Sequence, residues 1–342
     1  MDIKILLLIL VPLGTAFLIP LIDLINAKLR RFFVLLGILL ESYLIISIIV
    51  NNFQSLKNGD FFLQYYLGGW HPPIGISLAM DGLSLLFTVI TALSLFLIVI
   101  YSIGYIGHHE GKYYVLYFLI AAASMGSILT ADMFNIYVFI EMLTITSGAL
   151  IGFKRSQEAS AAAIKYLIYN VLAGLLFFLG VLLIYFNLGT LNMAAISQNF
   201  ASLESGIQLF ISAIFLTAIL IKMGIFPFFF WLPKSYDTAP SPVTAVLSGI
   251  LSKVYLYIFI RIFWTVIGFE TLMALNLNIL LLDIALLSSF FGHVFALQSN
   301  NIKRLLGYSS IGHIGMILAV LMLNTDAGFY GGLLHIISHM FM

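Results

Sequence analysis

The sequence contains no cysteine and very little charge. The lack of cysteine excludes disulfides, thiolate catalysis, Cys-ligated zinc and iron–sulfur clusters within this chain. Only 8% of the 342 residues are Asp, Glu, Lys or Arg, against about 25% in a typical soluble domain. The net charge of +1 argues against nucleic acid as a partner. What is present instead is 62% apolar residues. So little polar surface cannot cover them, which predicts a protein that lies in lipid.

Long apolar runs recur along the whole chain. A helix crosses the hydrocarbon core with about 20 mostly apolar residues, and no connection between the runs is long enough for a soluble domain. The first run is long enough to stay in the membrane as an anchor, so we expect no cleavable signal peptide. We predict an all-α polytopic membrane protein with eleven spans, at 3–25, 33–51, 80–105, 114–131, 134–153, 161–186, 207–231, 240–264, 274–298, 305–323 and 327–342. The longest connection, 52–80, is rich in glycine and aromatic residues and is expected at the membrane interface.

The basic residues alternate between successive connections. Cytoplasmic connections of membrane proteins carry an excess of Lys and Arg. With the N-terminus outside, the inner connections carry nine basic residues and the outer ones three: Lys28, Arg30, Arg31, Lys112, Lys154, Arg155, Lys234, Lys303 and Arg304 against Lys4, Lys57 and Arg261. We therefore predict a multi-pass protein of the plasma membrane with its N-terminus outside.

Five charged residues lie near the middle of predicted spans: Glu41, Glu141, Lys222, Lys253 and Asp283. Each costs about 2.5–3.5 kcal/mol at the centre of a membrane helix, and such residues usually mark paths for ions or protons. Glu141 illustrates the problem, because it stands in the run FNIYVFIEMLTITSGAL with no positive charge within four residues. The alternative is that these charges only hold helices together.

The neighbours of two of these charges favour pairing inside the protein. Tyr137 lies four residues before Glu141, on the same helical face, and can donate a hydrogen bond to it. Gly249 lies four residues before Lys253, and small residues allow another helix to approach closely.

Lys222 is followed closely by Gly224 and Pro227 in the stretch KMGIFPFFFWLP. Proline removes a backbone donor and clashes with the preceding turn, so we predict a helix broken at mid-membrane by Pro227. Broken helices near the membrane midplane are common at transport sites.

Four histidines fall in the last three predicted spans, at positions 293, 313, 335 and 339. His335 and His339 share a helical face at the i, i+4 spacing, which can hold a metal ion. No carboxylate lies nearby, so we favour the alternative, a proton relay that titrates near neutral pH.

Several stretches together cover nearly the whole chain and resemble one family. They are GGWHPPIGISLAMDGLSLLF (68–87), TADMFNIYVFIEML (130–143), KMGIFPFFFWLPKSYDTAPSPVTAVLSGILSKVYLYIFIR (222–261), YSSIGHIG (308–315) and HIISHMFM (335–342). The chain resembles the antiporter-like membrane subunits of Mrp-type cation/proton antiporters, respiratory complex I, and archaeal membrane-bound hydrogenases and sulfane reductases. The first two stretches resemble the Mrp D-type and hydrogenase branch most.

The resemblance implies roles for individual residues. It pairs Glu141 with Lys222 and makes Lys253 the link to a polar axis along the membrane. His313 and His339 match further relay positions, and His335 accompanies them on the last helix.

The resemblance also implies two inverted five-helix repeats, each with one broken helix. It divides the chain into a three-helix region (1–113), a first repeat (114–265) and an incomplete second repeat (266–342). Lys234 and Tyr236 stand where the family often has an acid and a histidine. The family typically continues beyond the position of Met342 with a lysine and further helices. Glu41 and Asp283 match no family position.

From this resemblance we expect an ion-translocating subunit, for H⁺ or Na⁺ or both, in a complex with other membrane subunits. The host complex is either an Mrp-type antiporter or a respiratory oxidoreductase, and we expect no cofactor or metal in this chain. Burial favours the neutral form of a lysine and a nearby carboxylate favours the charged form. Movement of Glu141 would therefore switch the proton affinity of Lys222. An inert scaffold and a solute transporter are the alternatives.

Overall fold

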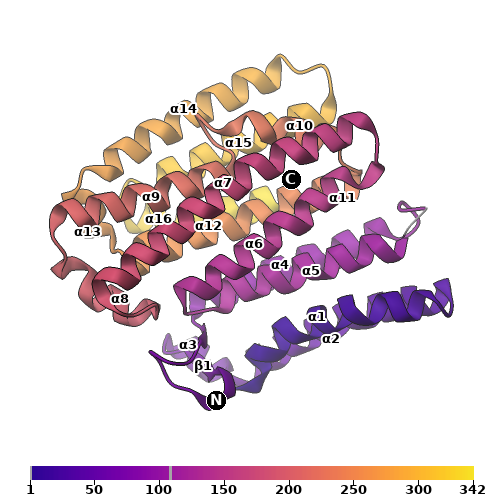
Figure 1. Ribbon diagram of the computed structural model, residues 1–342, viewed down its shortest axis with the longest axis horizontal. Helices are drawn as coiled ribbons and strands as arrows, with labels where there is room; N and C mark the ends of the chain where they lie inside the picture. The colour runs from indigo at the N-terminus through magenta and orange to yellow at the C-terminus, as the bar shows by residue number, and fades with distance from the viewer. Residues whose placement is uncertain (1, 108–109) are drawn as a thin grey trace. The chain divides into compact units, whose positions relative to one another are not determined.

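The computed structural model describes residues 2–107 and 110–342. The chain folds into two compact units, Met1–Leu150 and Ile151–Met342. Both units are built almost entirely from helices (Figure 1).

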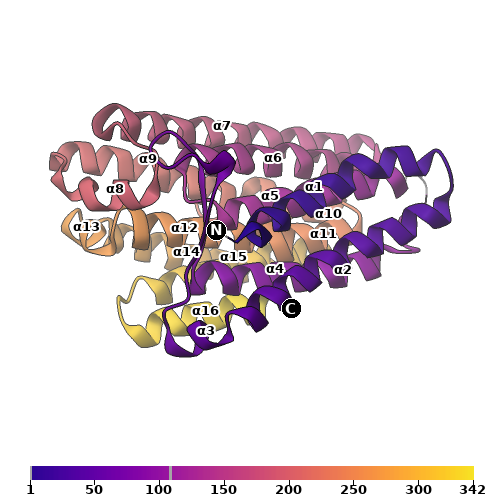
Figure 2. The ribbon, with the colours of Figure 1, turned by 90° about the horizontal axis from the view of Figure 1, so that it is seen from below.

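Unit 1 consists of long helices and one small hairpin. Its elements are α1 (Ile3–Asp23), α2 (Ala27–Asn51), α3 (Phe53–Asn58), β1 (Leu63–Tyr66), η1 (Leu67–Gly69), β2 (Ser77–Met80), α4 (Gly82–Ser102), α5 (Glu110–Leu129) and α6 (Met133–Ile151). The N-termini of α1, α2 and α4 are capped by the side chains of Asp2, Asn26 and Asp81, which accept hydrogen bonds from backbone N–H groups that have no partner in the helix. Asp81 and Ser84 form a reciprocal capping box that starts α4. The first two helices form an antiparallel pair, visible in Figure 2.

The connection 52–80 contains a two-stranded antiparallel sheet, which the prediction of an all-helical chain missed. Leu63 pairs with Met80 and Tyr66 with Ser77. The Ala131 amide donates to the Ser77 carbonyl at 2.9 Å, which fixes the hairpin to the end of α5. The sequence signal for strands was weak here because the connection is dominated by Gly, Pro and aromatic residues.

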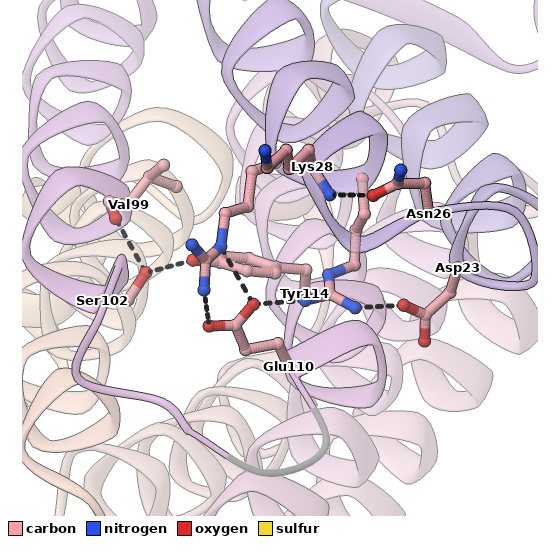
Figure 3. A network of polar contacts seen from close by, with 9 residues as sticks. Asp23, Asn26, Lys28, Val99, Ser102, Glu110 and Tyr114 are labelled. Carbon is pink, nitrogen blue, oxygen red and sulfur yellow. Dashed lines mark hydrogen bonds and ion pairs between the residues drawn. The ribbon is translucent and has the colours of Figure 1, made fainter.

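An ion-pair network joins three helices at one end of unit 1 (Figure 3). Arg30 of α2 contacts both Asp23 of α1 and Glu110 of α5. The Arg31 guanidinium also donates to Glu110, at 2.7 Å. Glu110 is only 4% exposed, so it depends on these two arginines for the hydrogen bonds that water would otherwise supply.

We expect Glu110→Gln to lower the free energy of unfolding by about 2 kcal/mol. Removing one partner of a buried ion pair leaves the other charge uncompensated, and the partial exposure of Arg31 reduces the effect. Unfolding of the purified complex by a denaturing detergent measures it. Glu158→Gln is the control, because Glu158 is 77% exposed. Equal stability of the two variants would contradict the prediction.

Unit 2 contains one long helix, one broken helix and a final helical hairpin. Its elements are η2 (Gly152–Lys154), α7 (Gln157–Leu188), α8 (Met193–Asn199), η3 (Phe200–Ser202), α9 (Ser205–Met223), η4 (Phe229–Trp231), α10 (Leu232–Thr238), α11 (Ser241–Val246), η5 (Leu247–Leu251), α12 (Ser252–Ile260), η6 (Arg261–Val266), α13 (Phe269–Ala274), α14 (Leu277–Leu297), α15 (Ile302–Leu321) and α16 (Asp326–Met340). The long helix α7 runs beside α9 in Figure 1.

Glycine allows α14 and α15 to pack backbone to backbone. A Cβ atom added to Gly292 would lie 2.4 Å from the amide nitrogen of Gly312, and one added to Gly315 would lie 2.5 Å from the amide of Ser289. Real atoms do not approach so closely, so any larger residue would separate the two helices. This close packing brings His293 of α14 against His313 of α15.

The predicted broken helix is confirmed, but it breaks before Pro227. Helix α9 ends at Met223, and Gly224 adopts a left-handed conformation with φ +65° that favours glycine. Neighbouring side chains satisfy the freed backbone groups: Trp231 Nε1 donates to the Ile221 carbonyl at 3.0 Å. The break therefore starts at a glycine C-cap, and Pro227 lies inside the non-helical segment.

Ten helical spans of the described residues are long and apolar enough to cross a membrane, whereas the sequence predicted eleven. The eleventh predicted span, 327–342, is present as α16, which has 15 residues. At 1.5 Å per residue it extends about 23 Å, less than a hydrocarbon core of about 30 Å.

Several charged residues gather at one end of unit 2. The Lys234 ammonium lies 3.8 Å from Glu158, and Arg304 donates to Asp237 at 3.1 Å. Lys303 donates to the Ala239 carbonyl at 2.7 Å. The N-terminus of α7, the segment 234–239 and the N-terminus of α15 therefore share this end.

Candidate functional site

Lys222 lies next to the break in the seventh predicted span and is 1% exposed. Because α9 ends one residue later, Lys222 is in the last helical turn rather than in mid-helix. Its ammonium donates to the main-chain carbonyl of Asn170 on α7, at 2.9 Å. It also lies 6.0 Å from the centroid of the Tyr255 ring on α12, which faces it with π electrons.

Lys253 is fully buried and follows a turn of π-helix. Such turns free backbone carbonyls from the regular pattern and are frequent at functional sites. Here the Lys253 ammonium donates to the Ser248 carbonyl at 2.7 Å. The same atom lies 2.9 Å from His339 Nδ1. Lys253 and His339 are therefore in direct contact in unit 2.

The four histidines form a continuous chain. His339 is 4% exposed and stacks on His313 with ring centroids 4.8 Å apart. His313 Nδ1 lies 3.1 Å from His335 Nε2. His293 packs edge-on against His313 at 5.5 Å.

The ring nitrogens of His335 and His339 do not converge on one point, as they would in a metal site formed by this pair. His335 and His339 do share α16, but their ring nitrogens point to His313 and Lys253. No group of three or more His, Asp or Glu residues in the described part of the chain is arranged to hold a metal ion. These two hydrogen bonds join α16 to α15 and to α12.

Glu141 lies on α6 in unit 1 and is partly exposed. Tyr137, one turn earlier, is close enough to interact with it electrostatically. This agrees with the shared helical face expected from their spacing.

The other two mid-span acids have opposite environments. Asp283 was expected to be a buried charge, but it is exposed on α14. The reason is that α14 packs through the face that carries Leu281, Ala285 and Gly292, and Asp283 lies outside that face. Glu41 is 1% exposed within unit 1, as expected for a buried charge.

The structure adds three groups that the sequence did not single out. Asn170 and Ser248 contribute main-chain carbonyls, which carry no signal in the sequence. Tyr255 stands two residues after Lys253 in SKVYLY and is 2% exposed. The position of the polar Asn170 in the run YLIYNVLAGLLFFLG is the signal that the sequence offers for this helix.

A buried amine hydrogen-bonded to an imidazole can pass a proton without releasing it to water. Lysine donates, the imidazole nitrogen accepts, and the other ring nitrogen can then donate to the next ring. In unit 2, Lys253 is hydrogen-bonded to His339, His339 stacks on His313, and His313 is hydrogen-bonded to His335. Lys222 supplies a second buried amine on the neighbouring helix α9.

The chain matches a known family model and several known membrane subunits. The transmembrane family model of NADH:quinone oxidoreductase and Mrp antiporter proteins matches residues 130–342. The chain is 32% identical over 311 residues to the D-type subunit of the Na⁺/H⁺ antiporter of Alkalihalophilus pseudofirmus, covering 90% of this chain and 61% of that protein. It is 32% identical over 291 residues to the N-type subunit of the NADH-quinone oxidoreductase of Desulforudis audaxviator, covering 84% of this chain and 58% of that protein.

Solved structures share the fold. A chain of the membrane-bound sulfane sulfur reductase, an archaeal respiratory membrane complex, matches with a TM-score of 0.91 and 31% identity, covering 99% of this chain and 69% of that one. A chain of the Mrp complex from Dietzia sp. DQ12-45-1b matches with a TM-score of 0.87 and 24% identity, covering 99% of this chain and 62% of that one.

The chain spans about three fifths of the length of the curated relatives it matches. Within that shared part, the family model covers the broken helix, both buried lysines and the histidine chain. This multi-pass membrane chain belongs to the NADH:quinone oxidoreductase/Mrp antiporter transmembrane family.

Proposed function

We propose that the chain is an ion-translocating subunit of a multi-subunit membrane complex, in which protons move through Lys222, Lys253, His339, His313 and His335. The observation that carries this proposal is the buried contact of 2.9 Å between Lys253 and His339, continued by the stacked and hydrogen-bonded histidines. Two buried amines and a chain of imidazoles are costly in a membrane unless they serve a path. The relatives named as Na⁺/H⁺ antiporter and NADH-quinone oxidoreductase subunits support it.

Reconstitution of the purified complex into vesicles tests this function. We expect movement of H⁺, reported by a pH-sensitive dye, to depend on Lys222 and Lys253. A Na⁺-sensitive dye in the same vesicles separates Na⁺ exchange from proton movement alone. If charge-removing substitutions at both lysines leave transport unchanged, the chain is a scaffold.

We keep Glu141 as the residue that controls the charge of Lys222, and the inverted-repeat division at residues 114 and 266 as the frame of the path. The partial exposure of Glu141 and the neighbouring Tyr137 suit a carboxylate whose surroundings change during transport. A solute transporter is less suitable, because the broken segment that follows Lys222 contains few polar side chains.

The N-terminus is placed outside in this proposal, and the membrane is the plasma membrane. The nine-to-three distribution of basic residues supports this orientation. So does the gathering of Lys234, Lys303 and Arg304 at one end of unit 2.

Cysteine labelling checks the orientation. The chain has no native cysteine, so single cysteines at Ser156 and Ser202 need no cysteine-free background. Both positions are exposed, at the start of α7 and just before α9. We expect an impermeant maleimide to label Ser156→Cys only from inside and Ser202→Cys only from outside. Labelling of both from the same side would overturn the orientation.

A further inference from the structure

A buried carboxyl in unit 1 lies outside the lysine and histidine path. Glu41 stands in the middle of α2, and its Oε1 has no hydrogen-bond partner among the described residues. No ion pair joins it to a Lys, Arg or His in the part of the chain that the structure describes. An ionised carboxylate is costly in that setting, and a bound proton removes the charge.

An unpartnered hydroxyl of α5 lies at about the same depth of unit 1 as Glu41. A Cβ atom added to Gly37, one turn before Glu41, would lie 3.2 Å from the Phe118 ring. Helices α2 and α5 run in the same direction from the ion pair between Arg30 and Glu110. One turn further along both helices, Glu41 is therefore level with the segment just before Ser124. The Ser124 hydroxyl is fully buried and has no partner among the described residues.

Helix α4 contributes two more such hydroxyls. The Tyr117 hydroxyl of α5 donates to the Leu95 carbonyl of α4, which aligns the two helices. Thr91 and Thr88 lie one and two turns from Leu95, in the direction of Ser124. Both threonine hydroxyls are fully buried and lack a partner in the described chain. Three helices thus bring uncommitted polar groups to one depth of unit 1.

Three tyrosines lie between the level of Glu41 and the end of unit 1 that carries Glu110. Tyr113, Tyr114 and Tyr117 are all fully buried. Tyr114 lies one helical turn after Glu110, and its hydroxyl is 3.2 Å from Ser102 Oγ (Figure 3). The Tyr113 ring lies 5.2 Å from the Tyr114 ring and 6.0 Å from the Tyr117 ring.

Tyr117 completes the connection, because it is close enough to interact electrostatically with Glu41. The other charged groups that face this region lie towards the two ends of α2. Arg30 and Arg31 are held by Glu110 and Asp23 at one end. At the other end, the Lys4 ammonium of α1 donates to Ser47 Oγ at 2.6 Å, about one and a half turns beyond Glu41.

We propose that Glu41 is a proton-binding site in unit 1, filled from the Glu110 end through the hydroxyls of Tyr114, Ser102, Tyr113 and Tyr117. Each hydroxyl oxygen accepts a proton from one side and gives its own proton to the next group, so no charge accumulates along the row. The last proton forms the O–H bond of the Glu41 carboxyl, and release follows the reverse order. The Thr91, Thr88 and Ser124 hydroxyls lie at the same depth of unit 1 and have no partner of their own among the described residues.

Infrared difference spectroscopy of the intact complex tests the site without requiring transport. We expect the wild-type spectrum to contain a carbonyl band of a protonated carboxyl that is lost reversibly when the bulk pH is raised, and that is missing from Glu41→Gln. Glu41→Asp keeps a carboxyl and should show the band at a shifted frequency, which covers the case that Glu41→Gln does not assemble. A Glu41 band that does not respond to pH would overturn the proposal. Loss of the band on adding Na⁺ at constant pH would also overturn it, because Na⁺ would then be the ligand.

The route is tested by Tyr117→Phe against Tyr43→Phe. Tyr43 lies on α2 two residues after Glu41 but is 65% exposed, so its hydroxyl lies outside the row. Transfer into heavy water shifts the band as the proton exchanges for deuterium. We expect Tyr117→Phe to slow this exchange about tenfold, the scale of one lost hydrogen bond in the path, and Tyr43→Phe to leave it unchanged. Equal rates in the two variants would contradict the route.

Discussion

We expect Lys222→Ala to abolish ion translocation while the complex still assembles. The substitution removes the ammonium that donates to the Asn170 carbonyl and faces the Tyr255 ring. Both partners keep their backbone positions, because they belong to α7 and α12 rather than to the broken segment. Vesicles with the variant complex should therefore show only the proton leak of vesicles without protein. Assembly is checked by co-purification of the other subunits.

Lys222→Arg separates a proton carrier from a structural cation. Arginine keeps the positive charge, but guanidinium does not release its proton in the working range of the complex. We expect this variant to fail as completely as the alanine variant. Glu141→Gln should also impair transport, because an amide keeps the shape of the side chain without its negative charge. Transport at the wild-type rate by the arginine variant would show that Lys222 does not carry the proton.

Lys234→Arg is the matched control for that comparison. Lys234 is 38% exposed and pairs with Glu158 and Asp237 at the end of unit 2. Arginine can replace it there without any need for proton release. We expect this variant to transport at the wild-type rate. A loss of transport would instead show that a Lys-to-Arg substitution by itself disturbs folding.

The second large effect is expected at His339. Asn in place of His339 can still accept a hydrogen bond from Lys253, but it cannot take and return a proton. Removal of a positioned proton-transfer group typically costs about a hundredfold or more in rate, and we expect a loss of that size in proton movement through the vesicles. Lys253 remains buried and hydrogen-bonded to Ser248, so the variant should assemble.

His71→Asn provides the control for the histidine prediction. His71 lies in the exposed connection of unit 1 and has no place in the proposed path. Its variant should translocate protons at the wild-type rate. A wild-type rate for His339→Asn would mean that Lys253 passes its proton elsewhere.

The sequence alone determined that this protein lies in a lipid membrane, and it identified the charged residues inside the apolar runs. A charged fraction of 8% requires a lipid environment, and the length of the apolar runs sets the number of spans to within one. Lys222 and Lys253 stood out because a charge in an apolar run is costly wherever the run folds. The resemblance in 222–261 was strong because the break, both lysines and their neighbours fall in one continuous stretch.

Only the tertiary structure decided which of these residues meet. His339 and Lys253 are 86 positions apart, so no helical spacing could place them 2.9 Å from each other. The carbonyls of Asn170 and Ser248 were invisible to the sequence, because every residue has one. The same limit explains the contrast between Glu41 and Asp283: both are acids in apolar runs, but α2 buries one of them while α14 leaves the other exposed. Burial depends on how the helices pack. The sequence of one helix does not show which residues of another helix will contact it.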